Sequence, residues 1–134
     1  MRKFLLASHG NLAAGMKNTI EMIAGARDDI QAIEAYTKEI PDVKAYMDAY
    51  MKNRNEDDEL VIVTDLLGGS VNNEMSQYRT FPNVYVIAGM NAALVLNLVL
   101  GEGSIETLIA ESIQAAKEQI SYMEKEEASD EEDF

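Results

Sequence analysis

The chain has 134 residues, of which 24 are acidic and 11 basic, with one histidine and neither cysteine nor tryptophan. This length suits a single domain with a sizeable core, and 47% hydrophobic with 26% charged residues is typical of a soluble globular protein. The absence of cysteine excludes disulfides, zinc–thiolate sites, iron–sulfur clusters and thiol catalysis. A single histidine also excludes a multi-histidine metal site, so we expect neither a metal nor another cofactor.

The net charge of −13 argues against nucleic acid or an anionic membrane surface as partner, because both need a cationic footprint. Glu124–Phe134 holds seven acids and one lysine, and we expect it to be a disordered tail behind a domain of residues 1–123. The apolar run after Arg2-Lys3 is too short for a secretory signal, and Ala92–Leu100 is too short to span a bilayer. We therefore expect a cytoplasmic protein without membrane insertion.

The first half of the chain alternates between strand and helix patterns. Phe4–Ala7 is a continuous apolar run, typical of a strand buried on both faces, and Ile30–Tyr36 has the alternation of a second strand. A helix is expected after each. The first helix has the apolar stripe Leu12, Met16, Ile20 and Ile23 and is closed by Gly25. The second helix has Pro41 in its first turn and the apolar stripe Val43, Tyr46, Met47, Tyr50 and Met51.

The second half continues this alternation. Leu60–Thr64, a β-branched run without charges, is the clearest strand, and Val84–Ala88 is another. Between them we predict a helix that has Ser70 as its N-cap. Its inward residues are expected to be Val71, Met75 and Tyr78. Two further helices are expected, one over Ala92–Leu100 and one from Ser104 onward. The core positions of the last helix are Ile105, Leu108, Ile109, Ile113 and Ala116.

This order of elements predicts an α/β fold: an open, mostly parallel, doubly wound sheet with helices on both faces. In such sheets ligands bind outside the carboxyl ends of the strands, where the strand order reverses. The residues that follow the strands are therefore the candidates for a functional site.

Three strand ends carry polar or small residues that can form one site. The first strand ends at His9, the third at Asp65 and the fourth near Asn91. A lone histidine is more often structural, but His9 lies at a strand-to-helix turn beside Gly10, where anions are stabilised. Asp65 can accept a hydrogen bond from His9 Nδ1–H, which leaves Nε2 as a nucleophile, although by itself it could equally be a strand-end cap.

Gly68-Gly69-Ser70 offers backbone N–H groups and a hydroxyl suited to phosphoryl oxygens, although most such triplets are simple turns. No Walker lysine follows it and no dinucleotide-binding glycine pattern is present. A Ser-His-Asp hydrolase is a competing interpretation. Ser8, however, should point away from His9 on an extended strand, and no Gly-x-Ser-x-Gly elbow occurs. Histidine as the nucleophile fits better.

These segments resemble the mannose-family enzyme IIA components (mannose, fructose and sorbose type) of the bacterial phosphoenolpyruvate:sugar phosphotransferase system. Ser8–Met16 is similar to the family's opening T/S-H-G-x-x-A-x-G-L segment, and Glu21–Gly25 continues the likeness. Val63–Ser70 with Asn72-Asn73 matches the Gly-Gly-Ser region, and Ala88–Asn91 looks like the S/A-G-x-N turn. The likeness spans roughly residues 3–123, and the combination of motifs is specific even though each motif alone is not.

The resemblance implies a phosphotransferase with a phosphohistidine intermediate. His9 would accept a phosphoryl group from the phosphorylated histidine carrier protein and pass it to a IIB component, which serves a membrane sugar permease. Asp65 would orient the imidazole. The residues expected around the phosphoryl group are Gly10, Gly68, Gly69, Ser70 and Asn91. The family is usually dimeric, often with an antiparallel edge strand donated by the partner subunit.

The chain departs from the family pattern in two places and leaves one element open. The family commonly has proline after Gly-Gly-Ser and after G-x-N, whereas Val71 and Ala92-Ala93 stand here, so the geometry of these turns is open. Gln119–Met123 could be the donated strand, but Ile113, Ala116 and Ile120 equally continue a helical stripe.

Two alternative functions remain open. One is the phosphocarrier subunit that feeds dihydroxyacetone kinase, although the His-Gly and Gly-Gly-Ser forms favour the sugar system. The other is a non-catalytic, flavodoxin-like regulatory or binding module in which His9 is incidental. Phosphorylation of His9 separates a carrier from such a module.

Overall fold

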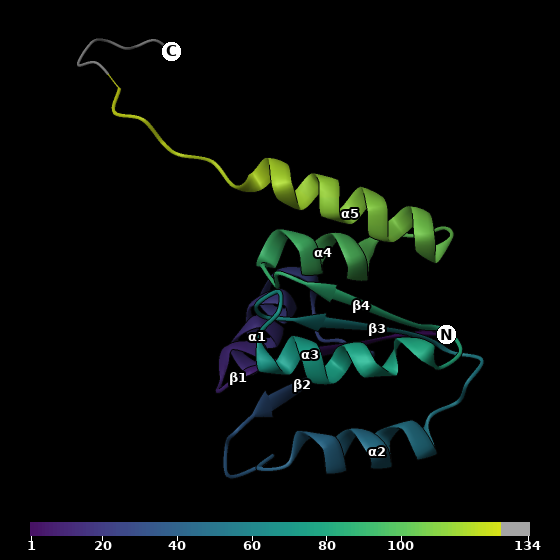
Figure 1. The fold of residues 1–134 in the computed structure, drawn as a ribbon. Coiled ribbons are helices and arrows are strands. Elements are labelled where there is room, and N and C mark those ends of the chain that lie inside the picture. The colour runs from purple at the N-terminus through teal and green to yellow at the C-terminus, as the bar shows by residue number, and fades with distance from the viewer. Residues whose placement is uncertain (127–134) are drawn as a thin grey trace.

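The computed structural model describes residues 1–126 and contains one parallel sheet of four strands in the order β2-β1-β3-β4, enclosed by helices (Figure 1). This confirms the predicted α/β class. The elements are β1 (Arg2–His9), α1 (Leu12–Ala24), β2 (Ile30–Ala35), α2 (Val43–Asn53), β3 (Glu59–Thr64), α3 (Ser70–Ser76), the 3-10 helix η1 (Gln77–Thr80), β4 (Val84–Ala88), α4 (Ala92–Leu100) and α5 (Ile105–Gln119).

The strand order explains why both faces of the sheet are covered. The chain steps from β1 outward to β2, and then reverses, crossing to β3 and on to β4. Because parallel crossovers are right-handed, this reversal places α1 on one face and α2 and α3 on the other. Figure 1 shows α4 on the side opposite α2 and α3, with α5 stacked outside α4. The reversal lies between β1 and β3, which is where ligand sites form in such sheets.

Each face of the sheet packs its own hydrophobic cluster. Alternate residues of the central strands serve the two faces: Phe4 and Leu6 pack with α1 and α4, whereas Leu5 packs with α2 and α3. Burial on both faces accounts for the unbroken apolar runs seen in the sequence. Two rigid layers thus hold the carboxyl ends of β1 and β3 in register, with Ala7 opposite Thr64.

Helices α1 and α2 differ from the sequence prediction at three positions. Leu12 and Ile23 are 50% and 62% exposed, because α1 buries a face centred on Ala13 and Ile20 instead. Pro41 precedes the helix, whose N-cap is Asp42, with the Asp42 side chain accepting from Ala45 N–H at 3.0 Å. An acidic side chain at this position satisfies a free N–H of the first turn, so the helix begins after it.

The end of the described chain is extended and exposed. After α5 ends at Gln119, residues 120–126 have no regular secondary structure and continue away from the helix (Figure 1). The side chains of Ile120, Tyr122 and Met123 are 79%, 83% and 83% exposed. Most of the predicted acidic tail, residues 127–134, lies outside the described residues.

Over residues 1–126, no helix is both long enough and apolar enough to cross a membrane.

Candidate active site

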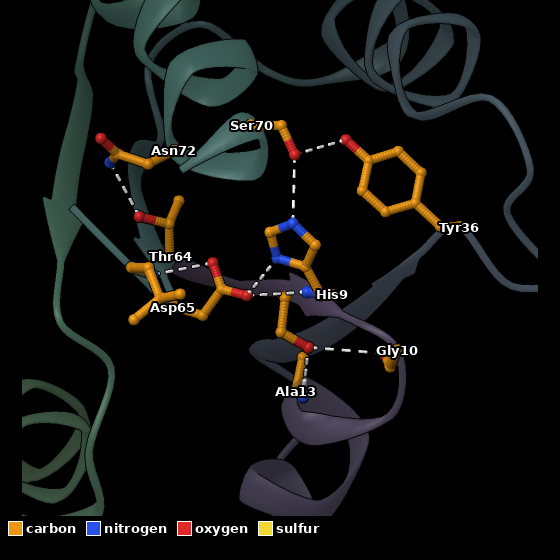
Figure 2. Close-up of polar contacts among 10 residues, drawn as sticks. His9, Gly10, Ala13, Tyr36, Thr64, Asp65, Ser70 and Asn72 are labelled. Carbon is orange, nitrogen blue, oxygen red and sulfur yellow. Dashed lines mark hydrogen bonds and ion pairs between the residues drawn. The ribbon is translucent and has the colours of Figure 1, made fainter. Parts of the chain in front are cut away.

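Three parallel strands and one helix bring four side chains together at the carboxyl edge of the sheet (Figure 2). His9 is the last residue of β1, Asp65 follows β3, Tyr36 follows β2, and Ser70 is the first residue of α3. The strands are parallel and adjacent, so residues far apart in the chain meet at one point. The candidate site therefore lies where the strand order reverses, the position at which ligands are expected in such sheets.

Asp65 holds the backbone and the ring of His9 through one oxygen. Asp65 Oδ2 accepts the His9 backbone N–H at 2.8 Å and lies 2.7 Å from His9 Nδ1 (Figure 2). The other oxygen, Oδ1, accepts the Leu66 N–H at 2.8 Å. The Asp65 side chain is only 7% exposed, whereas that of His9 is 45% exposed. The carboxylate is thus a buried anchor, and the imidazole is presented to solvent.

The Asp65 carboxylate is ionised under ordinary conditions. Burial by itself raises the pKa of Asp65, but the hydrogen bonds from the His9 backbone, the His9 ring and the Leu66 N–H outweigh it, and the pKa lies below its usual value. An ionised Oδ2 can only accept, so the hydrogen-bond network assigns the proton to His9 Nδ1. The lone pair of His9 is therefore on Nε2.

A hydroxyl relay lies on the Nε2 side of the ring. Ser70 Oγ is 3.1 Å from His9 Nε2, and Tyr36 Oη donates to Ser70 Oγ at 2.8 Å (Figure 2). The Tyr36 ring is tilted against the imidazole with centroids 5.3 Å apart. With Nε2 as acceptor, Ser70 donates to the ring and Tyr36 donates to Ser70. The arrangement orients the Nε2 lone pair and keeps a hydroxyl donor beside it.

Ser70 differs from its predicted role as N-cap of α3. Gly69 is the N-cap, with an extended backbone (φ −72°, ψ 169°), and Ser70 is the first helical residue. Its Oγ is consequently available to His9 instead of capping the helix. Gly69 also lies close to the ring, since a Cβ built at this position would be 3.8 Å from His9 Cε1 and 3.3 Å from the Leu66 carbonyl oxygen.

The predicted glycines shape the loops, but their N–H groups are already used. Gly10 N–H donates to the Ala35 carbonyl at 3.0 Å, Gly68 N–H to Asn72 Oδ1 at 3.1 Å, and Gly69 N–H to the Leu66 carbonyl at 3.0 Å. Gly10 and Gly68 have φ values of +56° and +79°, a backbone conformation that favours glycine. These residues therefore support the site through loop conformation.

Asn91, another expected site residue, is hydrogen-bonded within its own turn. Its Oδ1 accepts the Leu94 N–H at 2.9 Å, which caps α4, and its Nδ2 donates to the Gly89 carbonyl at 2.9 Å. Both polar ends of the side chain are thus occupied in the turn between β4 and α4. In this structure Asn91 shapes that turn.

Buried polar contacts hold the loops behind the site. Ser8 is fully buried, and its Oγ accepts the Ala13 N–H at 2.7 Å. The Ser8 side chain therefore faces away from the exposed side chain of His9, as expected, and the two cannot form a serine triad. Asn72 Nδ2 donates to the buried Thr64 Oγ1 at 2.8 Å, which ties the start of α3 to the end of β3. With Val71 in place of the family's proline, α3 still places Ser70 against His9.

Tyr36 is the site residue that sequence reasoning missed. The sequence carried a signal, because Tyr36 ends the second predicted strand, as His9 and Asp65 end or follow theirs. Its φ of +64° is uncommon for a bulky residue and turns the side chain back toward Ser70.

In the part of the chain that the structure describes, no group of three or more His, Asp or Glu side chains is arranged to hold a metal ion.

The fold and the site together define a parallel α/β protein with one exposed histidine, oriented by a buried carboxylate at the reversal of strand order. Residues 3–121 match the family model described as "PTS system fructose IIA component". The chain therefore belongs to the fructose and mannose IIA family of the sugar phosphotransferase system.

Solved structures support this assignment. A protein from Klebsiella pneumoniae described as a putative phosphoenolpyruvate-dependent sugar phosphotransferase system permease is 36% identical, with a TM-score of 0.85 and 90% of each chain covered. A phosphotransferase system IIA protein associated with the fucose utilization operon of Streptococcus pneumoniae is 25% identical (TM-score 0.67, 88% and 95% covered). The mannose/sorbose-specific IIA subunit of Enterococcus faecalis shares the fold at 22% identity (TM-score 0.83, 96% and 98% covered).

Proposed function

We propose that this IIA component is a phosphocarrier in which His9 Nε2 accepts a phosphoryl group from the phosphorylated histidine carrier protein and passes it to a IIB component for sugar uptake. The observation that carries the proposal is the orientation of the ring: Nδ1 is held by Asp65 at 2.7 Å, and Nε2 is on the side of Ser70. His9 is the single histidine of the chain, so no other imidazole competes for this role.

The transfer step follows from this geometry. The Nε2 lone pair attacks phosphorus, the N–P bond of the donor phosphohistidine breaks, and its electron pair returns to the donor imidazole. The new phosphoimidazole keeps its Nδ1 proton and gains positive charge, which the Asp65 carboxylate stabilises. Ser70 Oγ–H then turns from Nε2 to an oxygen of the phosphoryl group. The reverse sequence delivers the group to the IIB acceptor.

The surface around His9 suits a protein partner. Leu66 and Leu67, which directly follow Asp65, are 66% and 85% exposed, and Leu12 near the start of α1 is 50% exposed. Exposed leucines beside a nucleophile favour docking of another protein over enclosure of a small molecule. The net charge of −13 is suited to a basic donor. We also propose a homodimer, whose test is argued in the Discussion.

The direct test is phosphorylation by the purified system. Phosphoenolpyruvate, enzyme I and the histidine carrier protein should together add one acid-labile phosphoryl group to the wild-type chain. Intact-mass measurement detects the added group. His9→Ala should remain unmodified while keeping the far-UV circular dichroism spectrum of the wild type, because the His9 side chain is 45% exposed. An unlabelled wild type, or a labelled His9→Ala variant, would refute the phosphocarrier function.

A further inference from the structure

A cavity lies at the opposite end of the sheet from His9. Its volume is about 510 Å³, and it is formed by the last turns of α2 and the first residues of β1 and β3, with Tyr46, Tyr50, Asn53, Arg54 and Lys3 among its lining residues. Lys3 and His9 are six residues apart on β1, so about 20 Å separates the cavity from the phosphorylation site. Figure 1 shows the end of α2 and the N-terminus on the same side of the molecule.

Arg54 lines this cavity and carries a buried donor without an acceptor. Arg54 follows α2 directly, and its Nη2 donates to the Asp58 carbonyl oxygen at 2.8 Å, which fixes the guanidinium. Its Nη1 is buried and has no hydrogen-bond partner among the residues that the structure describes. A buried guanidinium N–H without an acceptor is costly, so an acceptor from outside the chain that reached this nitrogen would stabilise the guanidinium.

The neighbouring charges leave the cavity locally cationic. The Asp58 carboxylate is paired with the N-terminal amino group at 3.1 Å, and Glu59 is paired with Arg2 at 2.8 Å. Lys3, which lines the cavity, is half-buried and has no ion pair within residues 1–126. Lys3 and Arg54 therefore give the cavity lining two cations, against the single paired carboxylate of Asp58, in a protein that is strongly acidic elsewhere.

Two tyrosines supply the less polar part of the cavity. Tyr46 and Tyr50 are four residues apart on α2 and both half-buried, so their rings lie on the same helix face. Burial raises the pKa of Tyr50, and the nearby Arg54 only partly opposes this, so the phenol stays a neutral donor. Such rings offer flat surfaces to a sugar or an aromatic ring.

We propose that this cavity is a binding site for a phosphate monoester that carries a ring, with the phosphate on Arg54 and Lys3 and the ring against Tyr46 and Tyr50. The planar guanidinium matches the geometry of phosphate oxygens, and a phosphate oxygen that reaches the buried Nη1 would be the acceptor that this nitrogen lacks. A cavity of this volume is within the usual range for small organic ligands. The ring can come from a sugar or from a nucleobase, and binding measurements distinguish the two.

The test is titration of the full chain with glucose 6-phosphate, adenosine monophosphate and inorganic phosphate. Amide NMR chemical shifts and calorimetry measure the binding. At least one ester should bind saturably and more tightly than inorganic phosphate, with shifts centred on the end of α2. Arg54→Gln should weaken that binding by about tenfold or more, because a charge-assisted hydrogen bond is lost. Arg79→Gln is the matched control, since this exposed arginine of η1 lies outside the cavity and should bind as the wild type does.

A second variant tests the cavity without altering its charges. Ala49 is exposed on α2 and lines the cavity, so Ala49→Tyr should fill the space and abolish ester binding while the helix remains intact. Phosphorylation of His9 should persist in both variants, which separates this inference from the proposed phosphocarrier function. Any of three results would overturn the proposal: neither ester binds, the esters bind no more tightly than inorganic phosphate, or both cavity variants bind the ester as the wild type does.

Discussion

At the scale of single residues, the orientation of His9 depends on Asp65 Oδ2, which accepts both the backbone N–H and the ring nitrogen of the same residue. Two hydrogen bonds to one carboxylate oxygen restrict both the position and the rotation of the imidazole. Because the hydrogen bonds to Asp65 keep its pKa below the usual value, the carboxylate remains charged throughout the neutral range. Orientation and charge stabilisation therefore come from one side chain.

Asp65→Asn is expected to slow phosphorylation of His9 by roughly two orders of magnitude without unfolding the protein. The amide can turn its NH₂ group toward Nδ1, which favours the wrong tautomer, and it carries no charge to stabilise the phosphoimidazolium. Rapid-quench measurement of the labelling rate checks this, with circular dichroism as the control for folding. A rate equal to that of the wild type would mean that Asp65 is only a strand-end cap.

Tyr36→Phe is expected to lower the labelling rate several-fold, a smaller effect than that of Asp65→Asn. The substitution removes only the hydroxyl that donates to Ser70 Oγ, and the ring contact with His9 remains. Because Tyr36 is 59% exposed, stability should be unchanged. The measurements are the same labelling assay and the midpoint of thermal unfolding. Tyr85→Phe is the matched control, because Tyr85 lies on β4 and is remote from His9.

The sequence predicted the two residues whose positions depend only on strand order, His9 and Asp65. The partners of the glycine N–H groups could not be predicted in the same way. Gly10 uses the Ala35 carbonyl of the neighbouring strand, and Gly68 uses the Asn72 side chain, so both depend on tertiary packing. Local motifs indicate which groups are present, but packing decides which of them remain free.

At the scale of the elements, all four strands and the five α-helices were predictable because their apolar periods are strong, whereas the 3-10 helix η1, which contains Tyr78, was not predicted. The exposed ends of the α1 stripe show where periodicity fails. Leu12 and Ile23 continue the spacing, but no described element covers them, whereas Ala13, which has little hydrophobic surface, is fully buried. A helical stripe predicts which face turns inward, and the length of the covering layer decides how much of it is buried.

Helix α5 contains one internal conflict, the buried Ser112. Its side chain is 1% exposed, and its Oγ has no hydrogen-bond partner within residues 1–126. Ser112→Ala is expected to raise the free energy of unfolding by about 1 kcal/mol, since it removes an unsatisfied hydroxyl and introduces a better helix former. Urea denaturation measures the change. Thr107→Ala, at an exposed position of the same helix, should change stability by less than about 0.5 kcal/mol.

At the scale of the whole molecule, two features remain without a partner inside the described chain. The sheet has β2 and β4 as its edge strands, each with one side of its backbone unpaired by any strand of residues 1–126. The extended segment after α5 exposes Ile120, Tyr122 and Met123 almost completely. An open sheet edge and an extended apolar segment each need to be covered, and exchange between two copies satisfies both at once.

We therefore expect a homodimer in which residues 119–123 of each subunit pair with the sheet of the other. Removing residues 119–134 should give a monomer or an aggregate, because the exchanged segment is lost, while removing only Glu124–Phe134 should leave the dimer intact, because this segment is mainly acidic. Sedimentation velocity distinguishes the species, and His9 labelling should persist in the shorter deletion. A monomeric wild type would contradict the dimer, and a dimer that survives the longer deletion would contradict the exchange of strands while leaving the chemistry of His9 unaffected.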